Sequence, residues 1–101
     1  MSTKLFRQLG IFQRRTSRKG EVYYVSGTGS DLNSGLHPLR AWRSIQKLNN
    51  NRNRISPQDF VLFQRGYEYP GIPFYLTRGE KPKVGAFGRG PMPRFPDVDC
   101  S

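Results

Sequence analysis

The chain has 101 residues, which is enough for one small domain. Lysine and arginine number 17 against 7 acidic residues, so the net charge of +10 favours an anionic partner: nucleic acid, acidic polysaccharide or an anionic membrane surface. The sequence excludes an internal disulfide because it has one cysteine. It shows no Cys/His cluster for zinc, and no apolar run of about 20 residues for a transmembrane segment.

Residues 1–20 predict a basic leader that is either disordered or an amphipathic arm. Leu5, Leu9 and Phe12 recur at helical spacing among lysines and arginines, and no acidic residue occurs in this segment. Arg7 interrupts the apolar stretch, which makes the segment a poor secretory signal. A transit-like peptide stays open, so the residues themselves do not assign a compartment.

A strand is predicted at Val22–Val25, where the composition changes from basic to β-branched and aromatic. A polar loop with three glycines follows over residues 26–35. Glycine is free to take a positive φ, so this segment is expected to turn more than once.

Residues 38–49 predict an amphipathic helix. The proline at position 38 suits the first turn of a helix. The apolar residues behind it form one stripe at helical spacing, and they are Ala41, Trp42, Ile45 and Leu48. A tryptophan on such a stripe is interpreted as core rather than as a platform for a ligand. The asparagines from position 49 end the helix, because asparagine tolerates the conformation common at helix C-termini.

Three further strands are predicted in the second half of the chain. Residues 60–63 are apolar at every position, which indicates a strand that is buried on both sides or lies in a parallel sheet. Residues 72–76 and Lys83–Phe87 are shorter runs bounded by glycine and proline. Val61 and Val84 lie 23 residues apart, and this spacing falls within the range of solenoid repeats.

The order of these features is more specific than any one of them. Residues 23–26 read Tyr-Tyr-Val-Ser, and the loop and the helix follow. Next come a turn at residues 55–59, the apolar run at residues 61–63 with Arg65-Gly66, and the glycine-bounded run at residues 79–88. In this order they resemble the N-terminal region of pectate-lyase-like right-handed parallel β-helix proteins, over residues 21–93. The resemblance implies a mainly β fold, an incomplete right-handed parallel β-helix of about two rungs with one N-terminal capping α-helix. Residues 94–101 would be its tail.

The resemblance also implies a function. The family includes polysaccharide lyases and glycoside hydrolases, which are secreted or cell-surface proteins whose catalytic groups lie on later rungs than this chain contains. We therefore predict a non-catalytic N-terminal fragment or module of a carbohydrate-associated parallel β-helix protein, with acidic polysaccharide as a partner. The residues agree, because we find no nucleophile–base pair, no paired carboxylates and no phosphate loop. No cofactor and no metal are predicted.

Arg65, Tyr67 and Tyr69 are the candidate carbohydrate-binding residues. Their spacing offers a cation and two aromatic faces to an acidic sugar. A solvated strand end is the plainer interpretation of the same residues. Asp31 and Asn33 resemble loop ligands, but side chains of this kind in a turn usually stabilise it through hydrogen bonds to the backbone.

Two other functions stay open at this point. Basic residues interleaved with aromatics favour a small nucleic-acid-binding protein, although no recognised nucleic-acid-binding motif is present. The absence of a predicted cap after the last strand favours a structural module that docks onto an additional β-helix chain.

Overall fold

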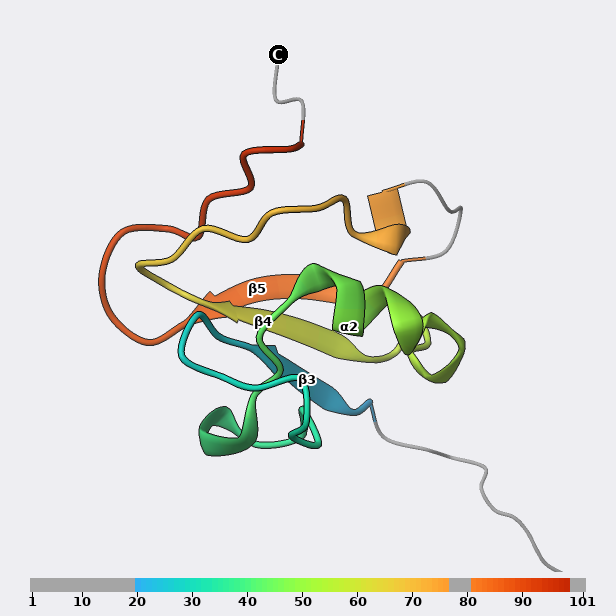
Figure 1. Cartoon of the computed structure of the whole chain (residues 1–101). Coiled ribbons are helices and arrows are strands. Elements are labelled where there is room, and N and C mark those ends of the chain that lie inside the picture. The colour runs from blue at the N-terminus through green and yellow to red at the C-terminus, as the bar shows by residue number, and fades with distance from the viewer. Residues whose placement is uncertain (1–19, 77–80, 99–101) are drawn as a thin grey trace, which may run out of the picture.

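Three short runs of β-branched and aromatic residues form one parallel sheet (Figure 1). The computed structural model describes residues 20–76 and 81–98, so the predicted basic leader and Cys100 lie outside the described residues. The strands are β3 (Val22–Val25), β4 (Phe60–Gln64) and β5 (Lys83–Phe87), in the spatial order β3-β4-β5. These three predicted strands are confirmed.

The register of the sheet places Val61 of β4 between Tyr23 of β3 and Val84 of β5. The prediction that Val61 and Val84 lie side by side in the same direction is therefore confirmed. Buried residues alternate with more exposed ones along β3 and β4, because successive side chains of a strand point to opposite faces. One face of the sheet thus carries the buried side chains, which include Val25 and Phe63.

The predicted incomplete β-helix with a capping α-helix is wrong. The described residues form a single open sheet of three parallel strands, and their longest helix, α2 (Ile45–Asn50), has six residues. The 23-residue spacing of Val61 and Val84 agrees with the pairing of β4 and β5, but it does not imply a β-helix. A β-helix requires the chain to wind repeatedly around a common axis. Within residues 20–76 and 81–98, no helix is long and apolar enough to cross a membrane.

The predicted helix over residues 38–49 is correspondingly divided. A 3-10 turn, η1 (Pro38–Arg40), comes first, and α2 begins only after Ser44, whose hydroxyl accepts a hydrogen bond from the backbone N–H of Lys47. Between them Trp42 is extended and bridges Val25: its N–H donates to the Tyr24 carbonyl at 2.9 Å, and its carbonyl accepts from the Ser26 N–H at 2.7 Å. These sheet-type hydrogen bonds replace those that a continuous helix would have formed there.

The predicted strand over residues 72–76 is also wrong. This segment contains a 3-10 turn, η3 (Phe74–Leu76), instead. The side chain of Asn49 holds the segment, because its Nδ2 donates to the Ile72 carbonyl at 3.0 Å and its Oδ1 accepts from the Phe74 N–H at 2.8 Å. A second such turn, η2 (Arg52–Arg54), follows α2.

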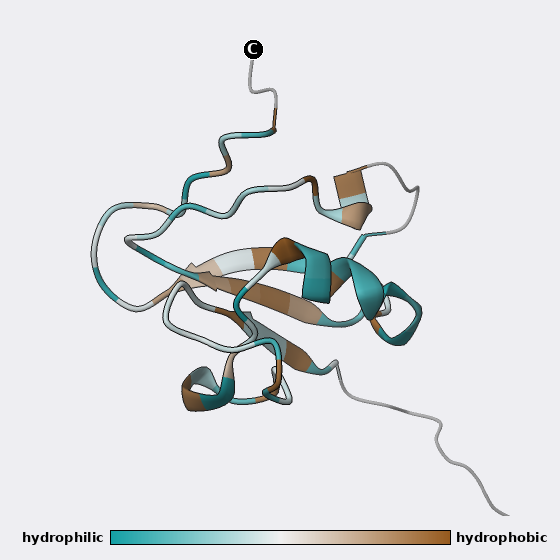
Figure 2. Ribbon diagram, in the orientation of Figure 1, coloured by the Kyte–Doolittle hydropathy of each residue, from teal (hydrophilic) through white to brown (hydrophobic). Residues whose placement is uncertain are grey.

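The core lies between the buried face of the sheet and the segments that cross in front of it in Figure 1, α2 among them. The hydrophobic colouring of β3 and β4 in Figure 2 follows the same region. Aromatic pairs fill the core: Tyr23 stacks on Trp42 with ring centroids 5.5 Å apart, and Phe63 packs against Tyr69 at 5.1 Å. The interpretation of Trp42 as core is confirmed.

Candidate functional site

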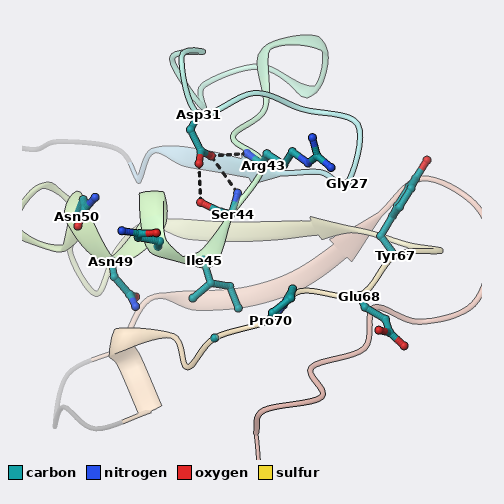
Figure 3. Close-up of a pocket in the computed structure, with 12 residues that line it drawn as sticks. Gly27, Asp31, Arg43, Ser44, Ile45, Asn49, Asn50, Tyr67, Glu68 and Pro70 are labelled. Atoms are coloured by element: carbon teal, nitrogen blue, oxygen red, sulfur yellow. Dashed lines mark hydrogen bonds between the residues drawn. The ribbon is translucent and has the colours of Figure 1, made fainter.

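A pocket lies where the glycine-rich loop and the start of α2 face the segment that follows β4 (Figure 3). Its volume is about 990 Å³. Most of its lining side chains are polar, and one aromatic ring contributes a flat face. The lining residues are Gly27, Asp31, Arg43, Ser44, Ile45, Gln46, Asn49, Asn50, Tyr67, Glu68, Pro70 and Gly71.

Asp31 fixes the loop to the start of α2. Its Oδ1 accepts hydrogen bonds from the backbone N–H groups of Arg43 and Ser44 at 2.9 and 3.0 Å, and its Oδ2 accepts from the Ser44 hydroxyl at 2.6 Å. Burial alone would raise the pKa of Asp31, but the hydrogen bonds from Ser44 and Arg43 and the charge of Lys47 together hold that pKa below its usual value. The carboxylate is therefore a structural anchor, as turn stabilisation predicts.

The same anchor positions Arg43. Its backbone N–H is held by Asp31, while its side chain extends toward Gly27 and Tyr67 (Figure 3). Arg43 is exposed, and no hydrogen bond or ion pair of its guanidinium is found within the part of the chain that the structure describes. A free guanidinium presents several donors in a planar fork that matches a carboxylate.

Tyr67 forms the aromatic wall of the pocket. Its ring lies against Gly27 so closely that a side chain at position 27 would overlap the ring. Tyr67 is 36% exposed, so part of the residue faces solvent. Glycine at position 27 therefore makes room for the Tyr67 ring in the pocket that Arg43 also lines.

The three predicted carbohydrate-binding residues do not gather at one place. Tyr67 lines the pocket, but Tyr69 is buried in the core, where its hydroxyl donates to the Gln64 carbonyl at 2.8 Å. Burial raises the pKa of Tyr69 to about 12. Arg65 is half-buried beside β5 and its backbone N–H donates to the Phe87 carbonyl at 2.8 Å, away from the lining residues.

Several lining residues were missed from the sequence. Arg43, Gln46, Asn50 and Glu68 were not identified as site residues. Asp31 is the residue from which these lining residues could have been predicted. Its hydrogen bond with Ser44 joins residues 13 positions apart, and so brings the loop between them to the start of α2. Glu68 makes an exposed ion pair with Arg94 at 3.8 Å.

Within residues 20–76 and 81–98, no group of three or more histidine, cysteine, aspartate or glutamate side chains is placed to hold a metal ion. The pocket instead combines a guanidinium, three primary amides and an aromatic face, contributed by Arg43, Gln46, Asn49, Asn50 and Tyr67. Groups of this kind bind a polar ligand through hydrogen bonds and ring contacts.

Comparison with known proteins gives one similarity of note. No family model matches the chain. A stretch of 55 residues, 54% of the chain, is 36% identical to part of a lacto-N-biosidase from Bifidobacterium longum subsp. longum. The match spans only 3% of that protein's length. The chain is thus similar to a small part of a carbohydrate-active enzyme, and the resemblance to pectate-lyase-like proteins stays a prediction.

Proposed function

We propose that this chain is a non-catalytic module of a carbohydrate-associated protein, and that the pocket beside Tyr67 holds a sugar. The observation that carries the proposal is the partly exposed Tyr67 in a pocket lined mostly, apart from Ile45 and Pro70, by polar side chains. The flat face of an aromatic ring packs against the apolar face of a sugar, while polar side chains bind its hydroxyl groups. The similarity to part of a lacto-N-biosidase supports a carbohydrate as the ligand class.

The guanidinium of Arg43 favours an acidic sugar over a neutral one, although the carboxylates of Asp31 and Glu68 also line the pocket. The guanidinium of Arg43 is free within the described residues, and the carboxylate of Asp31 is already occupied by three hydrogen bonds. Glu68 lies on the same pocket but has Arg94 as its ionic partner. The excess of basic residues over the whole chain adds a long-range attraction for a polyanion.

Calorimetric titration with two oligosaccharides of equal length, an oligogalacturonide and a neutral galactan, tests the proposal. Arg43→Gln should weaken binding of the acidic oligomer by about tenfold, because it removes a charge-assisted contact. Tyr67→Ala should weaken both by about tenfold, because it removes the ring. Arg89→Gln makes the same change of charge at an exposed position outside the pocket, and should leave both affinities unchanged.

Two results would contradict the proposal. In the first, neither oligosaccharide binds the folded wild-type chain. In the second, Arg89→Gln weakens binding as much as Arg43→Gln does, which would assign the attraction to net charge rather than to the pocket.

A second candidate function, docking of the sheet onto another chain, is favoured by the edge of β5. Within the described residues β5 pairs with β4 alone. Val84 is 49% exposed although its neighbour in the register, Val61, is fully buried. An open strand edge beside exposed apolar surface is a template for pairing with a further strand.

Light scattering coupled to size-exclusion chromatography tests self-docking, at high salt so that repulsion between basic chains is screened. This candidate predicts a concentration-dependent oligomer that Val84→Lys returns to a monomer. A wild-type chain that stays monomeric over the whole concentration range would argue against pairing between copies.

A further inference from the structure

Three leucines project from the loop between β3 and α2. Leu32 is 97% exposed, Leu39 is 85% exposed and Leu36 is 43% exposed. A single exposed leucine on a protein surface is ordinary, but three within eight residues, two of them almost entirely in water, form an unusual apolar feature. None of them lines the pocket.

The loop holds these leucines in place. The N–H of Gly35 donates to the Arg40 carbonyl at 2.8 Å, and the Nδ2 of Asn33 donates to the Ala41 carbonyl at 2.9 Å. The N–H of Leu39 donates to Nδ1 of His37 at 3.0 Å. These bonds draw the two ends of the loop together, so its apolar side chains are presented to solvent rather than folded against the core.

The loop is part of a segment that carries positive charge only. Between residues 32 and 58 there is no acidic residue. Its lysines and arginines are Arg40, Arg43, Lys47, Arg52 and Arg54. Arg40 is exposed and lies directly beside Leu39, in η1, which projects from the β3 side of the sheet in Figure 1 and carries hydrophobic colour in Figure 2.

We propose that residues 32–40 are a membrane-docking loop. Leu32 and Leu39, with Leu36 beside them, enter the boundary between headgroups and acyl chains of an anionic lipid surface. Arg40 remains at the level of the headgroups, where cationic side chains are attracted to anionic lipids and can extend their polar ends toward water. This surface is separate from the sugar pocket and goes beyond the proposed function.

A lipid surface fits the loop better than a protein partner does. A stable protein interface buries on the order of 800 Å² on each partner in a closely packed patch. The leucines instead are exposed one by one along the loop, and Arg40 follows Leu39, which suits a soft apolar layer beneath a charged one.

Co-sedimentation of the full chain with vesicles tests the proposal. Vesicles of equal parts phosphatidylcholine and phosphatidylserine should retain the wild-type chain, whereas pure phosphatidylcholine should retain much less of it. The double variant Leu32→Ser, Leu39→Ser should weaken binding to the anionic vesicles by about tenfold or more, since apolar surface no longer leaves water. The matched control Ile72→Ser, Met92→Ser removes two exposed apolar side chains elsewhere and should bind like the wild type.

A fluorescence measurement separates insertion of the loop from attraction by charge alone. Leu39→Trp should give a blue-shifted emission with anionic vesicles and be quenched by brominated lipid, while Ile72→Trp should show neither change. Trp42 is buried and contributes the same background to both variants. All variants keep the basic leader, so a difference between them belongs to the loop.

The proposal is overturned if the wild-type chain does not sediment with anionic vesicles. It is also overturned if the leucine double variant binds as well as the control variant, or if tryptophan at position 39 is not quenched. Either of the latter outcomes would mean that charge alone, including that of the leader, holds the chain at the surface.

Discussion

At the scale of single residues, two aspartates hold the loops of this chain. Asp59 is fully buried and accepts from the backbone N–H groups of Glu21 and Ser56 at 2.8 and 2.9 Å. Asp31 plays the corresponding part at the pocket, with three hydrogen bonds from Arg43 and Ser44. Each carboxylate satisfies backbone donors that a turn would otherwise leave unpaired.

Asp31→Asn should destabilise the fold by about 1 kcal/mol at neutral pH, because the amide cannot replace all of the hydrogen bonds that the carboxylate accepts. The native pKa of Asp31 lies below its usual value of 3.8, so its contribution is present above that value and is lost as the pH falls through the native pKa. Wild type and variant should therefore begin to converge in stability as the pH falls below 3.8, and should differ least below the native pKa of Asp31. Urea unfolding at several pH values measures this.

Glu68→Gln is the control for that titration, because its exposed ion pair with Arg94 contributes little. A stability difference between wild type and Asp31→Asn that stayed constant from neutral pH into strong acid would contradict the assigned role of the Asp31 charge.

At the scale of elements, the sequence predicts burial better than it predicts the path of the backbone. Ala41, Trp42, Ile45 and Leu48 are all buried, as their spacing predicts. The spacing does not reveal that Trp42 pairs with Val25 as an extended residue, because this contact joins distant parts of the chain. The helix predicted over residues 38–49 is therefore shortened to α2.

The candidate site was predictable only in part for the same reason. Tyr67 was identified as a binding residue and lines the pocket. Arg43 was not identified, because its place in the same pocket as Tyr67 depends on the contacts of Asp31 with Arg43 and Ser44 and on the small volume of Gly27. Tyr69 was also predicted to bind carbohydrate with Tyr67, whereas Tyr69 is buried and packs on Phe63.

Ser44→Ala should destabilise the chain by about 1–2 kcal/mol, because it removes both the N-cap of α2 and the hydroxyl that donates to Asp31. Ser34→Ala is the matched control, since its hydroxyl accepts only an exposed bond from the Leu36 N–H. Thermal unfolding followed by circular dichroism measures both. Equal melting temperatures for the two variants would contradict the role given to Ser44.

At the scale of the whole molecule, a small sheet leaves several surfaces for partners. The pocket lies between the loop after β3, the start of α2 and the segment after β4. The exposed leucines lie in the loop between β3 and α2, and β5 has an unpaired edge among the described residues. The net charge of +10 does not indicate which of these surfaces binds a partner, because it attracts any polyanion to the molecule as a whole. Binding of nucleic acid stays a prediction, which filter binding across a range of salt concentrations would test.

The most direct measurement of the central claim is a two-dimensional amide NMR titration of the labelled chain with the oligogalacturonide. The account predicts saturable shifts at Gly27, Ser44 and Tyr67, with β5 unchanged, and loss of those shifts in Tyr67→Ala. Shifts that do not saturate, or that fall along β5 while the pocket stays silent, would contradict it.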